Sequence, residues 1–198
     1  MMDRTEWQKF VDRCAHCQRC ELHESRTNAV VYRGSIEAPL MIIGEGPGRE
    51  EDEQGVPFVG RSGKLLDSAL KGLGIPEDVF HIANIVKCRP PGNRKPTHQE
   101  ALACRPLLQQ QFLFAKPKVI LLMGATAYQY FTGDTGGRIS QLRGQWLREG
   151  DCDILPTFHP AYILRSPSQR VHLWADLEAT RKKLEELGYL EPLATIDA

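Results

Sequence analysis

The sequence lacks several features that would assign it to a membrane, to secretion or to a polyanionic partner. No stretch approaches the roughly 18 apolar residues that a membrane-spanning helix requires. The first residues, MMDRTEWQKF, are polar and acidic and do not resemble a signal peptide. The formal net charge is zero, so no overall basic field attracts nucleic acid, although a local basic face is still allowed. We therefore expect a cytoplasmic protein without a membrane partner.

Internal repeats, low-complexity linkers and long runs of like charge are also missing. The chain has 198 residues, which is enough for one domain with a full hydrophobic core. We expect a single domain over residues 1–198. Residues 1–26 would supply an N-terminal helix and the first cysteines, and residues 188–198 would form a C-terminal tail. We expect the protein to be a monomer.

Six cysteines are present, and in a reducing compartment metal binding is favoured over disulfides. Cys14, Cys17 and Cys20 are spaced as C-x2-C-x2-C, Cys88 and Cys104 follow far downstream, and Cys152 stands alone. Four thiolates suit either a zinc ion or an iron–sulfur cluster. The spacing alone also allows Cys14 and Cys17 as the first pair of ligands.

Short apolar runs rich in β-branched residues alternate with helical patterns. The runs at 40–43, 81–86, 119–123 and 154–158 predict parallel strands buried on both faces. Helices are predicted at 63–73, 98–115, 125–131 and 168–187, the second after the capping-box spacing Thr97-His98-Gln99-Glu100. The alternation predicts a three-layer α/β/α sandwich with a central four-stranded, mainly parallel sheet. Functional loops are then expected after the strands, near Gly44, Asn84, Gly124 and His159.

The first of these loops, GEGPGREEDE at residues 44–53, combines glycines with acidic residues. Glycine-rich turns after strands often cradle phosphates, but this one carries five carboxylates within nine residues. The dinucleotide pattern G-x-G-x-x-G also fits poorly, because Arg49 stands where the third glycine is required. The loop is either a solvated acidic turn or a site for a neutral ligand or a developing cation. Phe58, in the Gly/Pro-rich segment that follows, could stack on a planar ligand or belong to the core.

Side chains that can form hydrogen bonds follow two other predicted strands. Asn84 offers a donor and an acceptor, which suits the edge of a nucleobase, although Asn is also a common turn former. His159 precedes Pro160 and is held in a defined place, either as a functional or as a structural histidine. The residues at 162–164 are apolar and would be either core staples or a wedge pushed into a base stack.

The motifs GEGPG-x-x-E-D, PFVGRSGKLLD, NIVKCRPPGNRKP and HPAYILR resemble those of the family 4 uracil-DNA glycosylases, the iron–sulfur enzymes of the uracil-DNA glycosylase superfamily. The resemblance runs from about Cys17 to Leu187. It implies a four-stranded parallel sheet between helices and a [4Fe–4S] cluster. It also implies a repair enzyme that hydrolyses the N-glycosidic bond of uracil in single- or double-stranded DNA, releasing uracil and leaving an abasic site.

The family pattern C-x2-C-x-L-x3-R aligns with residues 17–26. The resemblance therefore implies that the cluster ligands are Cys17, Cys20, Cys88 and Cys104. Cys14 and Cys152 are then ordinary thiols. The cluster is expected to be structural, because hydrolysis of the glycosidic bond transfers no electron.

The resemblance also implies roles around the base. Phe58 would stack on the uracil ring, and Asn84 would hydrogen-bond O4 and N3–H. His159 would contact O2 and stabilise the negative charge on the departing base. These are electrostatic and stacking roles that need a preformed pocket.

On the sugar side, the reaction builds positive charge, which a carboxylate near C1′ suits better than a phosphate cradle does. The resemblance places Glu45 and Gly46 beside the sugar and the attacking water. In the best-known relatives an aspartate that orients this water stands where this chain has Gly46, so Glu45 becomes the candidate. Glu51 is expected to crowd C5 and exclude thymine. The other acids of the loop are expected to be solvated or paired with basic residues.

A base in a duplex must be flipped out to reach such a pocket. Tyr162 and Leu164 are expected to fill the vacated space. Phosphate contacts, which make binding sensitive to salt, are expected from Lys87, Arg89, Arg94, Lys95 and Arg165.

Three alternatives stay open. The chain could be a catalytically silent nucleic-acid-binding homologue, an idea that Gly46 supports, or a glycosylase of broader range that also removes hypoxanthine or xanthine. A variant of the superfamily bonds covalently to its product through a histidine in an inserted basic loop. The corresponding segment here, PPGNRKPTHQE, contains His98 but is short.

Overall fold

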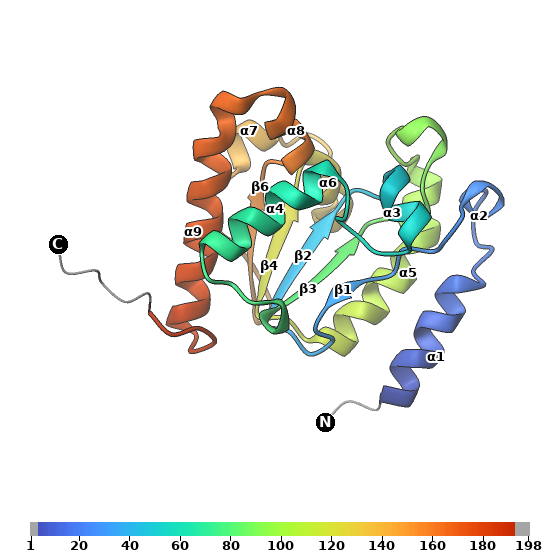
Figure 1. The fold of residues 1–198 in the computed structure, drawn as a ribbon, viewed down its shortest axis with the longest axis horizontal. Helices are drawn as coiled ribbons and strands as arrows, with labels where there is room; N and C mark the ends of the chain where they lie inside the picture. Colours follow the sequence, from blue (N-terminus) through green and yellow to red (C-terminus); the bar gives the residue numbers. More distant parts are fainter. Residues whose placement is uncertain (1–3, 193–198) are drawn as a thin grey trace.

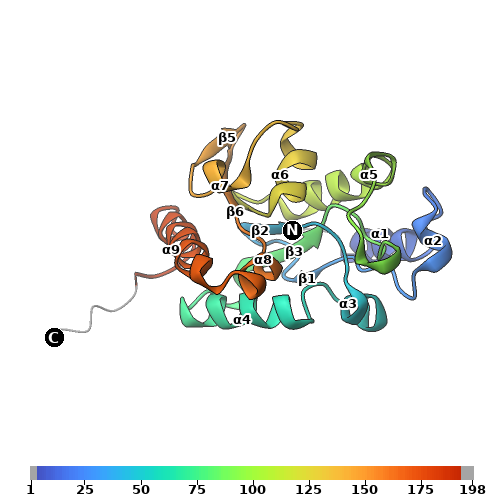
Figure 2. The same cartoon turned by 90° about the horizontal axis from the view of Figure 1, so that it is seen from above.

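The computed structural model describes residues 4–192 of the chain, and part of the C-terminal tail expected at 188–198 lies outside this range. One sheet lies between two layers of helices (Figures 1 and 2). Within the described residues the sheet has six strands in the order β1-β3-β2-β4-β6-β5. They are β1 (Arg33–Gly34), β2 (Leu40–Gly44), β3 (Phe80–Asn84), β4 (Val119–Met123), β5 (Leu147–Glu149) and β6 (Cys152–Thr157). The predicted three-layer α/β/α fold is confirmed.

The four central strands are the ones that the sequence predicts. β3, β2, β4 and β6 pair in parallel, and β2, β3 and β4 are buried at every position. Runs such as VILLM form these strands because helices cover both faces of the sheet. The bounds of β4 agree with the prediction, and the other strands differ from it by one or two residues at their ends.

Two antiparallel edge strands extend the sheet, so the prediction of four strands is wrong in number. β1 pairs with β3, and β5 pairs with β6. β1 has two residues and β5 has three, and neither contains an apolar run. Strands this short leave no periodic pattern in the sequence, and both lie at the edges, where one side has no strand neighbour to bury it.

The helices divide between the two faces of the sheet, as the view from above shows (Figure 2). One face is covered by α1 (Arg4–Ala15), α5 (His98–Ala115) and α6 (Ala125–Thr132), around a core that includes Met41, Ile43 and Ile120. The other face is covered by α4 (Arg61–Gly72), α8 (Pro160–Arg165) and α9 (Arg170–Glu186), around Leu40, Ile42 and Leu121. None of the helices in residues 4–192 combines the length and the apolar character needed to cross a membrane.

The remaining helices are short and lie in loops. They are α2 (Leu22–Ser25), α3 (Arg49–Gln54), α7 (Ile139–Leu142) and the 3-10 turns η1 (Glu77–Val79), η2 (Pro91–Asn93) and η3 (Pro167–Gln169). The capping box before α5 is present, since the Thr97 side chain accepts from the Glu100 N–H and the Glu100 carboxylate accepts from the Thr97 N–H.

Strand pairing brings the predicted functional loops to one edge of the sheet. Gly44 lies opposite Asn84 at the ends of β2 and β3, and Met123 lies opposite Thr157 at the ends of β4 and β6. The loops that follow these strands therefore leave the sheet side by side, at the upper edge in Figure 1. This edge is where parallel α/β sheets bind their ligands.

Candidate active site

A cavity of about 770 Å³ opens at the carboxyl ends of the central strands. All four predicted loops contribute to its wall. Of the residues that the sequence singles out, those in the wall are Glu45, Gly46, Glu51, Phe58, Asn84, Arg94, Lys95, His159, Tyr162 and Arg165. The structure thus brings together all of the predicted base-binding residues, together with Glu45, and part of the predicted DNA-binding set.

Asn84, the last residue of β3, carries an unpaired hydrogen-bond acceptor in the cavity wall. The residue is 2% exposed, and its Oδ1 has no hydrogen-bond partner among the residues that the structure describes. A buried acceptor left unpaired costs about 1–3 kcal/mol, so a ligand with a donor at this point would be favoured. The backbone of Asn84 is fixed separately, because the Lys87 ammonium donates to its carbonyl oxygen at 2.7 Å.

The Phe58 and His159 rings lie next to each other in the same wall. Their centroids are 5.6 Å apart, and the ring planes are inclined by 30°. Gly44 makes room for this group of side chains: a Cβ at Gly44 would lie 2.5 Å from Asn84 Oδ1 and 2.7 Å from Phe58 Cζ. A glycine is therefore required at the end of β2 for Phe58 and Asn84 to approach each other.

His159 is partly buried, and its hydrogen bonding fixes the tautomer of the neutral ring. It is the N-cap of α8, where Nδ1 accepts from the Ala161 N–H at 3.1 Å. Burial, with a smaller effect from the Arg165 charge, lowers the pKa of His159 from 6.5 to about 4. At neutral pH the ring is then uncharged with its proton on Nε2, so it presents a hydrogen-bond donor.

Glu45 follows β2 and is held by a residue that the sequence analysis did not single out. Thr126, near the start of α6, donates its hydroxyl hydrogen to Glu45 Oε2 at 2.5 Å and is itself 5% exposed. The loop near Gly124 was expected to be functional, but no side chain in it was assigned. Thr126 supplies that contribution by fixing the orientation of the carboxylate.

A side chain at Gly46, such as the aspartate that the resemblance implies at this position in other members of the family, would require Val86 to move. A Cβ at this position would lie 2.8 Å from Val86 Cγ2, which is side chain in the buried core. The backbone of Gly46 is thus packed against the loop that follows β3. Without an acid at position 46, Glu45 is the candidate for the water-orienting carboxylate. It lines the cavity, and its Oε2 is bonded to Thr126 in the same wall.

The other acids of the loop mainly hold the backbone. Glu51 Oε2 accepts from the Gly48 N–H, and Glu51 Oε1 accepts from the N–H groups of Val59 and Gly60 at 3.0 and 2.7 Å. Asp52 accepts from the N–H groups at residues 27 and 28, and Glu53 pairs with Arg49 on the surface. Glu51 lines the cavity, as its expected contact with C5 requires, but its carboxylate oxygens are engaged with the backbone.

The basic residues differ sharply in accessibility. Lys87 is 1% exposed, and burial lowers the pKa of its ammonium from 10.5 to about 8. The expectation that Lys87 binds a DNA phosphate is therefore wrong, because its side chain turns inward to the Asn84 carbonyl. Lys95, Arg94 and Arg165 are exposed. Arg94 forms a two-point ion pair with Glu100, and Arg89 bonds Asn93 Oδ1.

Residues 162–164 of α8 were expected to be either core residues or a wedge in a base stack, and they differ in how deeply they are buried. Ile163 is 1% exposed and packs into the core, whereas Tyr162 and Leu164 are 36% and 37% exposed. Arg165, which lines the cavity, is exposed at the end of the same helix. His98 lies elsewhere: its ring stacks on Tyr130, and it lines a separate hollow between α5 and α6.

Five cysteines surround a second, smaller hollow. It is lined by Cys14, Cys17, Cys20, Cys88 and Cys104, together with Arg26 and Lys87. Arg26 donates to the Cys88 sulfur at 3.1 Å. In the part of the chain that the structure describes, no three His, Cys, Asp or Glu side chains are arranged to hold a metal ion. All six cysteines are free thiols.

Four of the thiols that line this hollow, Cys17, Cys20, Cys88 and Cys104, are the set that the sequence resemblance implies as ligands of a metal group. Burial raises the pKa of Cys20, Cys88 and Cys104, the last to about 11, and the nearby cations Arg26 and Lys87 reduce this rise only in part. Cys14 is the most deeply buried of these five cysteines: it is 1% exposed, and burial raises its pKa to about 12. Cys152 lies apart, where its sulfur donates to the Pro117 carbonyl.

Comparisons with known proteins agree with these features. The model of the uracil DNA glycosylase superfamily matches residues 31–178. A type-4 uracil-DNA glycosylase of Thermotoga maritima is 40% identical over 194 residues, covering 95% of this chain and 100% of the relative. One of Sulfurisphaera tokodaii is 39% identical over 204 residues, covering 99% and 90%. One of Archaeoglobus fulgidus is 35% identical over 185 residues, covering 86% and 87%.

Proposed function

Because this chain belongs to the uracil DNA glycosylase superfamily, we propose that it is a repair enzyme that hydrolyses the N-glycosidic bond of uracil in DNA. The products are free uracil and an abasic site. The observation that carries the proposal is the unpaired, buried Oδ1 of Asn84, which lies in one cavity wall with Phe58 and His159. This set of groups suits a flat ligand with a polar edge, as a pyrimidine has.

Asn84 and Phe58 would select and hold the base. Uracil has an acceptor at O4 and a donor at N3, which match the Nδ2 donor and the Oδ1 acceptor of one Asn84 amide. Cytosine reverses both groups, so a fixed amide rejects it by leaving buried polar atoms unpaired. The Phe58 ring would stack on the base, a contact worth about 1–3 kcal/mol. Glu51, in the same wall, would limit the space at C5.

His159 would stabilise the charge that collects on the departing base. The neutral ring has its proton on Nε2, since Nδ1 accepts from the Ala161 N–H. A donor aimed at O2 gains strength as negative charge builds up there, so it acts on the transition state more than on the bound substrate. The base would leave as an anion stabilised by this hydrogen bond and by the Asn84 amide.

Glu45 would serve the sugar side of the reaction. The sugar gains oxocarbenium character as the bond to the base breaks, and a carboxylate near C1′ stabilises that charge. The same carboxylate can orient the attacking water and accept its proton. The Thr126 hydroxyl donates to Oε2 of Glu45, so Oε1 would accept the hydrogen bond from the attacking water.

DNA would bind across the mouth of this cavity with the uracil flipped out of its stack. Tyr162 and Leu164 would enter the vacated space from the exposed side of α8. Phosphates would be held by Arg89, Arg94, Lys95 and Arg165, which makes the affinity fall as salt concentration rises.

The four thiols of Cys17, Cys20, Cys88 and Cys104 would hold a [4Fe–4S] cluster. When bound, the cluster would supply a structural cross-link between the N-terminal segment, the basic loop after β3 and helix α5.

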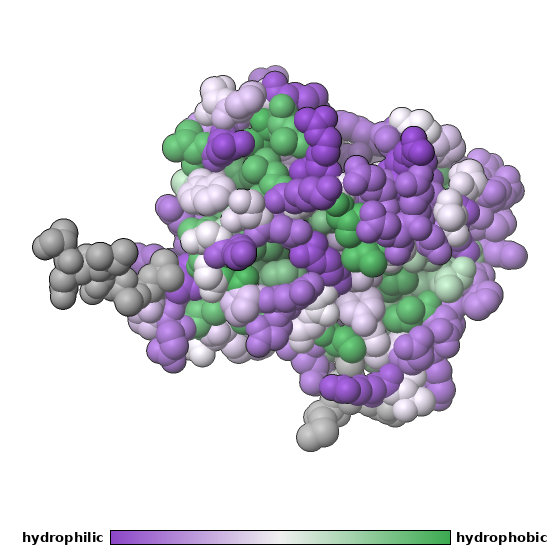
Figure 3. All heavy atoms as spheres, in the orientation of Figure 1, coloured by the Kyte–Doolittle hydropathy of each residue, from purple (hydrophilic) through white to green (hydrophobic). Residues whose placement is uncertain are grey.

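We propose that the protein acts in the cytoplasm, because its cysteines are free thiols, which a reducing compartment maintains. We also propose a monomer: one chain supplies the whole cavity, and on the face in Figure 3 hydrophobic residues occur in separate patches among hydrophilic ones.

Release of uracil from oligonucleotides tests the proposal. Single- and double-stranded DNA with one uracil should yield free uracil and an alkali-labile site, whereas thymine at the same position should stay. Binding without release would favour a silent homologue. Release of hypoxanthine or xanthine at a similar rate would favour the broader range. A protein–DNA adduct that survives denaturation and disappears in His98→Ala would favour the covalent variant.

A further inference from the structure

Phe58 has a backbone conformation that requires outside support. Its φ is +57°, in the left-handed region that non-glycine residues rarely adopt. Residues held in this way concentrate at ligand-binding sites and persist only where neighbouring groups fix them. Phe58 is 5% exposed and stands in the cavity wall beside His159. The groups that fix its backbone therefore decide where its ring meets the base.

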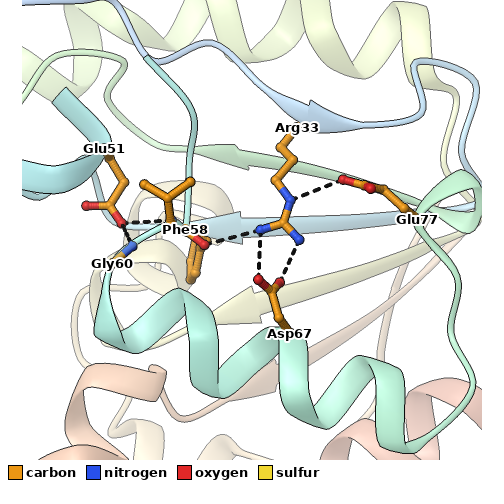
Figure 4. A network of polar contacts seen from close by, with 7 residues as sticks. Arg33, Glu51, Phe58, Gly60, Asp67 and Glu77 are labelled. Atoms are coloured by element: carbon orange, nitrogen blue, oxygen red, sulfur yellow. Dashed lines mark hydrogen bonds and ion pairs between the residues drawn. The ribbon is translucent and has the colours of Figure 1, made fainter. Parts of the chain in front are cut away.

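The segment after Phe58 is held by a carboxylate and by a close helix. Glu51 Oε1 accepts from the N–H groups of Val59 and Gly60, as Figure 4 shows for this network. On the other side, Gly63 in α4 lets the Phe58 carbonyl approach the helix. A Cβ at Gly63 would lie 1.8 Å from that carbonyl oxygen.

The Phe58 carbonyl oxygen itself accepts from Arg33, which lies on β1 at the edge of the sheet. Arg33 Nη1 donates to this oxygen at 3.2 Å (Figure 4). The guanidinium is fixed in turn by Asp67 on α4, with contacts of 2.6 and 3.2 Å, and by Glu77 at 3.2 Å. Its side chain is 19% exposed, so the arrangement is only partly open to solvent.

We infer that Arg33 and Asp67 are positioning residues, which hold the Phe58 ring in the plane where it stacks on the base. The inference rests on the proposed function, because it assumes that Phe58 stacks on uracil. A guanidinium can donate to the carbonyl and to both Asp67 oxygens at once because its donors form a rigid fork. Neither residue lines the cavity, so each acts on the base through Phe58.

The test is a double-mutant cycle between Arg33→Gln and Phe58→Ala. Affinity is measured for DNA that carries 2′-fluorinated deoxyuridine, which resists hydrolysis, and for DNA with a tetrahydrofuran abasic site, which has no base to stack. Phe58→Ala should weaken binding of the fluorinated DNA by about tenfold, as expected for one lost stacking contact. Arg33→Gln should weaken it by at least about threefold, and neither variant should change the affinity for abasic DNA.

In the Phe58→Ala background, Arg33→Gln should have no further effect on binding of the fluorinated DNA. An equal loss in both backgrounds would overturn the inference, because Arg33 would then act on something other than the ring. No loss from Arg33→Gln beside a clear loss from Phe58→Ala would overturn it while leaving the proposed function intact. No uracil release by the wild-type protein would instead remove the proposed function.

Arg181→Gln is the matched structural control. Arg181 also bonds backbone carbonyl oxygens and pairs with a carboxylate, Glu185, but lies on α9 away from the cavity. It should lower the thermal midpoint without changing the ratio of the affinities for the two DNAs. If Arg33→Gln does not fold, Asp67→Asn provides the same test, since it leaves Arg33 in place and removes its main anchor. An unchanged affinity ratio in folded Asp67→Asn protein would count against the inference.

Discussion

The proposed role of His159 leads to a prediction about both the rate and its dependence on pH. The ring has one free donor, Nε2–H, because Nδ1 accepts from the Ala161 N–H. Removing one preorganised donor to a developing negative charge typically costs about 3–4 kcal/mol, or a factor of about 10²–10³ in rate. His159→Ala should therefore lower the single-turnover rate by this factor while the affinity for uracil-containing DNA changes little.

The pH profile provides a second, independent check. A pKa lowered to about 4 keeps the ring neutral throughout the range in which an ordinary histidine titrates, near 6.5. The fraction of neutral ring, and with it this contribution to the rate, should stay constant as the pH falls from 8 to about 5. Single-turnover rates across this range, with His16→Ala as a control at an exposed histidine remote from the cavity, measure it.

Three results would refute the reasoning. A near-normal rate in folded His159→Ala protein would remove the donor role, and the chemistry would have to depend on Glu45. A step in the wild-type rate near pH 6.5 that disappears in His159→Ala would mean that the ring titrates normally and is not desolvated. A loss confined to the thermal midpoint would assign His159 to packing beneath the loop alone.

Three further predictions concern the base, the sugar and the metal group. Asn84→Asp should lower the rate of uracil release by about 10⁴-fold, because an ionised carboxylate cannot donate to O4, and near-normal release would remove Asn84 from the site. Thr126→Val, which keeps the shape and deletes the hydroxyl, should lower the single-turnover rate about tenfold at unchanged DNA affinity if Glu45 orients the water; an equal rate would contradict this. Anaerobically purified protein should contain about four irons per chain, unchanged in Cys14→Ala and Cys152→Ala, whereas zinc without iron would exclude the cluster.

The central sheet could be predicted because strands that are buried on both faces require continuous apolar runs in the sequence. The residues at the ends of those runs, such as Asn84 and His159, could be predicted as neighbours because parallel strands end at one edge. The edge strand β1 left no such pattern, and so Arg33 was missed. Its partner Asp67 lies in the interior of a predicted helix, where a carboxylate is ordinarily read as part of a solvated surface.

Lys87 shows the opposite failure. It stands in the densest basic segment of the chain, which predicts a phosphate contact, yet its side chain is buried and bonded to the Asn84 carbonyl. The sequence does not reveal which lysine of a basic loop turns inward. That choice depends on the hollow behind the loop, whose wall Lys87 shares with several cysteines.

The groups expected to contact the base or the water have one feature in common. Each is fixed by a hydrogen bond, in its side chain or its adjoining backbone, to a group that is not expected to react. Arg33 and Glu51 hold the Phe58 segment, Thr126 holds Glu45, and the start of α8 holds His159. Such support keeps the geometry fixed before the substrate arrives, which is what electrostatic stabilisation of a transition state requires. The contact of Lys87 with Asn84 extends the same support to the cysteine-lined hollow, because Lys87 contributes to the wall of that hollow. Lys87 thus connects the strand end that carries the Asn84 amide to the cysteine-lined hollow, although no cysteine lines the cavity at the ends of the strands.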